Sequence, residues 1–250
     1  MQKNTLSIKT ITSRRIDEMR KLRIALRQYL KTIPTPGDLP ARKATSVNNF
    51  FSDAAYLGKQ IRASVAPLLE NVTVPSRSNR MMKILMKGYD RKSSLHKNLT
   101  NTDLSRLKGF QFNARSSLQK VLPGPIHLDI NQDVGKVLIA VPSLKPLLSI
   151  SRERGSKYYQ YFSACVEVNL EEKKLVPTLV NSDPEILTDK ISETITMSHD
   201  IPPGCKMPVL IIFGIKFYAE HCGVLYPCNN CKNILQIIEV HNVKNNCYGT

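Results

Sequence analysis

The spacing of apolar residues changes along the chain, and this change predicts where helices and strands form. In the first half, apolar residues recur at every third or fourth position, which is the period of a helix with one buried face. Helices are therefore expected over Arg14–Leu30, Ser46–Glu70 and Ser76–Tyr89, with shorter helical pieces at Asn101–Leu107 and Ala114–Val121. A brief extended segment, Phe110–Phe112, is expected between the last two.

In the second half, apolar and polar residues alternate, which is the period of a strand with one buried face. About seven short strands are expected: Ile126–Ile130, Val137–Val141, Phe162–Val168, Leu175–Val180, Ile191–Met197, Met207–Tyr218 and Asn233–Val243. The last two are expected to fold back on each other. Because no strand here alternates with a long helix, an antiparallel β-sandwich is favoured over a parallel sheet.

These two patterns together predict an α+β protein. A mostly helical N-terminal region, residues 1–123, would be followed by an antiparallel β-sandwich-like C-terminal domain, residues 124–250. A chain of 250 residues is long enough to bury a sizeable core. No apolar run approaches the roughly 20 residues that a membrane span needs, and the first residues lack the apolar core of a signal peptide. A cytoplasmic location is therefore expected.

Charge is divided unevenly between the two halves. Residues 1–120 contain 24 Lys and Arg against 7 Asp and Glu, a net +17, whereas residues 121–250 contain 12 against 13, a net −1. The helix expected over Arg14–Leu30 has a basic face, formed by Arg15, Arg20, Lys21, Arg23 and Arg27. This face predicts binding to a polyanion such as nucleic acid, or to an acidic partner. The alternative is an ordinary helix whose basic face is only solvated.

The C-terminal half contains all six cysteines, and three of them form the only arrangement that resembles a metal site. Cys228 and Cys231 are separated by two residues, a spacing that brings two thiolates within reach of one zinc ion, and Cys222 lies just upstream. A structural zinc site needs four ligands, and no second closely spaced pair completes this one. The alternative is a turn with unpaired surface cysteines. No other cofactor is indicated.

The sequence motifs of common enzyme classes are absent. There is no glycine-rich phosphate-binding motif and no zinc-protease motif, and no histidine has the Ser, Cys or carboxylate neighbours that identify a catalytic triad. The carboxylates of the second half are expected at exposed turns and strand edges: Asp183, Glu185, Asp189 and Glu193. The sequence therefore favours a non-enzymatic protein.

Two blocks of sequence carry a resemblance to other proteins. The first is Ser46–Arg62, continuing to Pro67–Leu69 and Asn79-Arg80; the second comprises Ile212–Tyr218, Gly223–Pro227 and Asn233–Val240. Together they resemble a group of uncharacterised Bacteroidetes proteins of unknown function, which share a basic helical first half, an extended second half and a final hairpin. The resemblance implies no activity, cofactor or site. That group lacks cysteines in the turn between the last two strands, which counts against the zinc hypothesis.

The sequence as a whole predicts a non-enzymatic binding or assembly protein. Its basic helical half would contact a polyanion, including nucleic acid, or an acidic partner, and the β-rich half would supply protein contacts or self-association. One alternative is a small zinc-stabilised structural domain around the Cys228/Cys231 turn. Another, based on analogy of layout alone, is a virion-like or particle-forming shell protein with a basic arm.

Overall fold

The fold is described here from a computed structural model, over residues 46–70, 72, 77–87, 104–113, 115–152, 154–205, 207–228 and 232–241. All of these residues belong to one compact unit, Ser46–Thr250. The helix predicted over Arg14–Leu30 lies outside the described residues. None of the described helices is long and apolar enough to cross a membrane.

The helical part of the described chain follows the predicted apolar spacing. Helix α2 (Ser46–Ser64) buries Ala54, Leu57 and Ile61 on one face and continues into the 3-10 helix η1 (Ala66–Leu69). Pro67 stands at the start of η1, where its missing N–H breaks no helical hydrogen bond. The remaining helices of this part are α3 (Arg77–Lys87), the 3-10 helix η3 (Leu104–Leu107) and α4 (Leu118–Val121). Within the described residues, each segment predicted to be helical from Ser46 onward contains a helix, although the segment predicted over Ala114–Val121 is helical only from Leu118.

The larger of two antiparallel sheets has six strands. They are β3 (Tyr158–Asn169), β4 (Lys174–Asn181), β5 (Glu185–Ile186), β7 (Val209–His221), β8 (Val224–Pro227) and β9 (Ile234–His241). Strand β3 pairs with β4 and β5 along one edge and with β7 along the other. The edge of β7 away from β3 pairs with β9 over Val209–Ile215 and with β8 over Tyr218–His221. The predicted pairing of the last two long strands is confirmed.

The smaller sheet has three strands, β1 (His127–Asn131), β2 (Lys136–Val141) and β6 (Ile195–Asp200), in the order β1-β2-β6. A short helix, α5 (Pro146–Ser149), follows β2. A strand is present in each of the seven predicted segments, but the one predicted over Ile191–Met197 begins at Ile195 and runs on to Asp200, and Ile191 is exposed outside it. The short strands β5 and β8 were not predicted, because two and four residues are too few to show a period.

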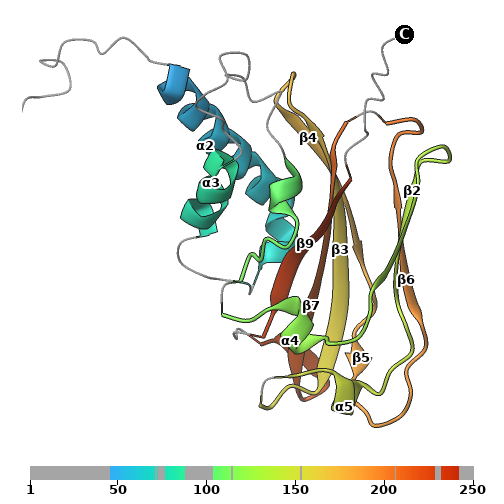
Figure 1. Ribbon diagram of the computed structural model, residues 1–250. Helices are drawn as coiled ribbons and strands as arrows, with labels where there is room; N and C mark the ends of the chain where they lie inside the picture. The colour runs from blue at the N-terminus through green and yellow to red at the C-terminus, as the bar shows by residue number, and fades with distance from the viewer. Residues whose placement is uncertain are drawn as a thin grey trace, which may run out of the picture. The chain divides into compact units, whose positions relative to one another are not determined.

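The larger sheet is buried on both faces. One face packs against α2, α3 and η3 and contributes Phe162, Leu210 and Ile212 to a first core. The other face packs against the smaller sheet and contributes Phe213 and Ile215 to a second core. Figure 1 shows α2 and α3 on one side of β3, β7 and β9, and β2 and β6 on the other. The described residues thus form an α+β arrangement in which helices cover the outer face of a two-sheet sandwich.

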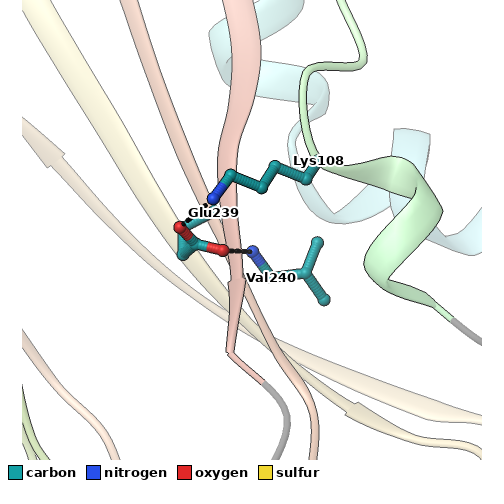
Figure 2. A network of polar contacts seen from close by, with 3 residues as sticks. All are labelled: Lys108, Glu239 and Val240. Atoms are coloured by element: carbon teal, nitrogen blue, oxygen red, sulfur yellow. Dashed lines mark hydrogen bonds and ion pairs between the residues drawn. The ribbon is translucent and has the colours of Figure 1, made fainter.

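The outer edge of β9 is covered by the segment that follows η3. The Gly109 N–H donates to the Ile237 carbonyl (2.8 Å), and the Phe112 N–H donates to the Leu235 carbonyl (2.8 Å). Just before this segment, Lys108 Nζ lies 2.6 Å from Glu239 Oε2, while Glu239 Oε1 accepts from the Val240 N–H (Figure 2). The predicted extended segment is therefore confirmed, and it fastens the helical layer to β9.

Candidate anion-binding site

The residues that the sequence singled out for binding lie mostly outside the described part of the chain. Arg15, Arg20, Lys21, Arg23 and Arg27 all precede Ser46, the first described residue, and Cys231 falls in a gap. The two remaining sequence candidates, Cys222 and Cys228, are both described.

Cys222 and Cys228 occupy different ends of strand β8. Cys222 and Gly223 form the two-residue turn between β7 and β8, with φ of 50° and 76°, and Cys222 is exposed. Cys228 is half-buried after β8, with its Sγ 3.7 Å from Ser156 Oγ. The four residues of β8 separate them by about 13 Å of extended chain. Among the described residues no group of three metal-ligating side chains occurs, and zinc binding by Cys222, Cys228 and Cys231 stays a prediction.

A buried polar cluster, which was not predicted, joins the two sheets. His199 of β6 has its Nε2 2.8 Å from Ser163 Oγ of β3 and its Nδ1 3.0 Å from Thr178 Oγ1 of β4. Burial lowers the pKa of His199 to about 4. His199 is 1% exposed and Ser163 is fully buried, so no substrate reaches the serine hydroxyl. The cluster links β6 of the smaller sheet to β3 and β4 of the larger sheet in the protein interior. The one available signal was that His199 continues the inward alternation of Ile195 and Met197.

A second polar contact corrects one expectation about the carboxylates. Glu185, expected at an exposed edge, is only half exposed, and its Oε2 accepts a hydrogen bond of 2.5 Å from Tyr159 Oη. Burial and this hydrogen bond raise the pKa of Tyr159. Asp183, Asp189 and Glu193 are exposed, as expected. The burial of Glu185 was not predicted because strand β5, with two residues, is too short to show which of them points inward.

The strongest concentration of unbalanced charge in the described chain lies on helix α3. Arg77, Arg80, Lys83 and Lys87 recur at three- and four-residue steps on one side of this helix, and the helix contains no Asp or Glu. We call these four residues the α3 basic face. Lys83 and Lys87 are exposed, whereas Arg77 and Arg80 are half-buried.

Arg62, near the end of α2, extends this charge toward the neighbouring helix. Burial, and then the positive charge of Arg77, lower the pKa of Arg62. Burial and the charge of Arg77 also lower the pKa of Arg80. The ion pairs of the described residues involve other cations: Lys108, Lys136, Lys157 and Lys173. Arg77 therefore repels both Arg62 and Arg80, and none of the three has a carboxylate at ion-pair distance in the described part of the chain.

Arg80 differs from Arg62 and Arg77 because its guanidinium makes hydrogen bonds within the protein. Its Nη1 and Nη2 donate to the carbonyls of Gln111 (2.8 Å) and Phe112 (3.2 Å), and its Cζ lies 5.2 Å from the centroid of the Phe110 ring. Arg80 thus fastens α3 to the segment that covers β9. Of the three described arginines on α2 and α3, Arg62 and Arg77 are the two whose guanidinium groups the fold does not use in this way.

A groove runs between α2 and α3 beside these arginines. It measures about 180 Å³ and is lined by Phe51, Ala54, Ala55, Gly58, Arg62, Ser78, Asn79 and Met82. The α2 side of the lining is apolar from Phe51, which is 55% exposed, to Gly58, and α3 adds the polar Ser78 and Asn79. Arg62 supplies the one charge among the lining residues. The groove is thus apolar at one end and cationic at the other.

Comparison with known proteins identifies no relative. The chain matches no family model, no curated protein and no solved structure. The functional argument therefore rests on the geometry and charge of the helical layer.

Proposed function

We propose that this protein is a non-enzymatic binding protein that contacts an anionic partner through its helical layer. The observation that carries the proposal is the set of cations on α2 and α3, namely Arg62, Arg77, Lys83 and Lys87, which have no carboxylate at ion-pair distance in the described chain. Cations held close together raise the free energy of the protein until an anion neutralises them. An anionic ligand would therefore be bound at the place where this repulsion is greatest.

The net charge of the chain supports the same proposal. The excess of +17 belongs to residues 1–120, which include α2 and α3, and the β-rich remainder carries −1. A one-sided charge attracts anions to that side and leaves the other available for different contacts. The competing explanation is a basic surface that is only solvated, and binding measurements separate the two.

The test is binding of the full-length protein to labelled duplex DNA, single-stranded RNA and an acidic peptide over a series of salt concentrations. A protein that contacts several phosphates shows a fall in log affinity with log salt of about 0.9 for each phosphate on duplex DNA. A steep slope with any of these anions supports the proposal. A flat and weak response with all three at low salt would mean that the basic surface is only solvated.

Charge-reversal variants locate the contact. Arg77→Glu, Lys83→Glu and Lys87→Glu together should weaken binding and reduce the salt slope. The matched control is Lys120→Glu, Lys145→Glu and Lys190→Glu, which makes the same change in net charge at exposed positions away from α3. A third variant, with Arg20, Arg23 and Arg27 changed to Glu, tests the helix predicted before Ser46. Equal losses in all three would point to net charge alone and contradict a defined site on α3.

A further inference from the structure

The groove between α2 and α3 contains a glycine, Gly58, at a position where the packing would accept a side chain. Gly58 lies inside α2, where glycine costs about 1 kcal/mol of stability relative to alanine. A Cβ added at Gly58 would meet Arg62 Nη1 at 3.5 Å, Leu85 Cδ1 at 3.7 Å and Met81 Sδ at 3.7 Å, which are ordinary contacts. Packing therefore has room for a side chain at this position. What the glycine provides is depth in the groove.

The size of the groove indicates the kind of ligand that fits it. Pockets for small molecules and cofactors usually measure about 300–1,000 Å³. A groove of about 180 Å³ between two helices is smaller than this and suits one apolar side chain that projects from a partner protein. Ala55, which is exposed on the α2 side, leaves the entrance free.

Charge decides which protein segment fits. Arg62 lines the groove, and Arg77 lies close enough to lower the pKa of Arg62. The chain's own first 45 residues hold 11 Lys and Arg against 3 Asp and Glu, a net +8, so they are repelled from this surface. An acidic segment from another protein is attracted to it.

We propose that the groove between α2 and α3 binds an acidic amphipathic segment of a partner protein. An apolar side chain of the partner enters the groove over Ala54, Ala55 and Gly58, while a carboxylate of the partner pairs with Arg62 and Arg77. This inference rests on the proposed function, and it names the anionic partner as a protein rather than a nucleic acid.

The spacing along α2 sets the spacing required of the partner. Ala55 and Arg62 are seven residues apart, which is about 10 Å along a helix. A helical partner lying along the groove meets both ends if an apolar residue and an acidic residue are also seven positions apart. Helix-in-groove recognition of this kind obtains its affinity from the apolar anchor and its orientation from the charges.

The experiment uses the full-length protein and three labelled probes. The first is a helical peptide of about 15 residues with Leu on one face and Glu on the other. The second is a peptide of the same charge in which Ser replaces every Leu. The third is a single-stranded oligonucleotide. The proposal requires that the Leu–Glu peptide binds about tenfold or more tightly than the Ser–Glu peptide, since one buried anchor is worth that much.

Two variants then separate the groove from the charge. Ala55→Leu places a large side chain in the groove, and because leucine is a good helix former and position 55 is exposed, α2 remains folded. This variant should bind the Leu–Glu peptide about tenfold more weakly and bind the other two probes with unchanged affinity. Arg62→Gln should weaken both peptides. The groove proposal is wrong if Ala55→Leu does not change the affinity for the Leu–Glu peptide, or if the oligonucleotide binds more tightly than the Leu–Glu peptide. Either result would leave the proposal of anion binding intact. If none of the probes binds, and duplex DNA does not bind either, the proposed function fails as well.

Discussion

At the scale of single residues, His199 shows how burial in this fold creates a dependence of stability on pH. Its folded pKa of about 4 lies below its ordinary value of 6.5 because burial penalises the charged ring. A pKa that is lower in the folded state means that the unfolded chain binds the proton more tightly. The stabilisation is therefore complete above about pH 6.5 and is lost as the pH falls toward 4, up to a limit of about 3 kcal/mol.

The corresponding prediction concerns His199→Gln, which keeps an amide near Ser163 and removes the titrating group. We expect the loss of unfolding free energy between about pH 7 and pH 4.5 to be smaller in the variant by roughly 2 kcal/mol. Urea unfolding at the two pH values measures it. His127→Gln, at an exposed position of β1, is the matched control. Equal pH dependence of stability in wild type and His199→Gln would show that His199 is protonated as easily in the folded state as in the unfolded state.

Gly58 gives a second prediction at this scale. Because a Cβ there meets only ordinary contacts, Gly58→Ala should gain the helix propensity of alanine without a steric cost. We expect the free energy of unfolding to rise by about 0.5–1 kcal/mol, measured by chemical denaturation. A decrease would mean that α2 and α3 approach too closely for a methyl group.

At the scale of elements, replacing a glycine by alanine is expected to lower the free energy of unfolding when the glycine lies in strand β7. A Cβ at Gly214 would come within 2.5 Å of Phe162 Cζ and even closer to the Ile234 carbonyl oxygen. Gly214 is therefore what allows β3, β7 and β9 to pack with the Phe162 ring across them. We expect Gly214→Ala to lower the free energy of unfolding by about 1–3 kcal/mol through overpacking. Chemical denaturation beside Gly58→Ala tests this; an unchanged stability would contradict it.

The elements also show which parts of the fold the sequence could predict. Period-two alternation located β2 and β7 because each has a continuous buried face, with Val137, Ile139 and Val141 fully or almost fully buried on β2. Periodicity says which side of an element is apolar, but it does not say what covers that side. The position of α2 and α3 over β3, β7 and β9 therefore had no sequence signal beyond the two-sided apolar character of β7 and β9.

The candidate site was hidden for a different reason. The apolar spacing of Ser76–Tyr89 identified the buried side of α3 through Met81 and Leu85. The cations on its other side looked like an ordinary solvated surface, since a linear sequence does not show which carboxylates lie nearby. The groove is less predictable still, because Arg62 and Asn79 line it from two helices and their separation in sequence says nothing about distance.

At the scale of the whole molecule, the central sheet couples the helical layer to the sandwich. The first core contains residues from α2, α3, η3, β3, β7 and β9, and the second core uses the opposite face of β3 and β7. The surface ion pair between Lys108 and Glu239 adds little, since exposed pairs contribute at most about 1 kcal/mol. Shared apolar burial is therefore what makes the two layers depend on each other.

This dependence leads to the last prediction. Far-ultraviolet circular dichroism is dominated by the helices, whereas near-ultraviolet dichroism reports on tyrosines in fixed surroundings, which include Tyr159 and Tyr161 of the second core. Because both layers share β3 and β7, the two signals should change together during denaturation. Leu57→Ala, which opens a cavity in α2 at a site 2% exposed, should lower the stability measured by both signals equally, by about 2–5 kcal/mol. A loss of the helical signal alone would mean that the helical layer and the β-rich part unfold as separate domains, as a boundary near residue 123 would require.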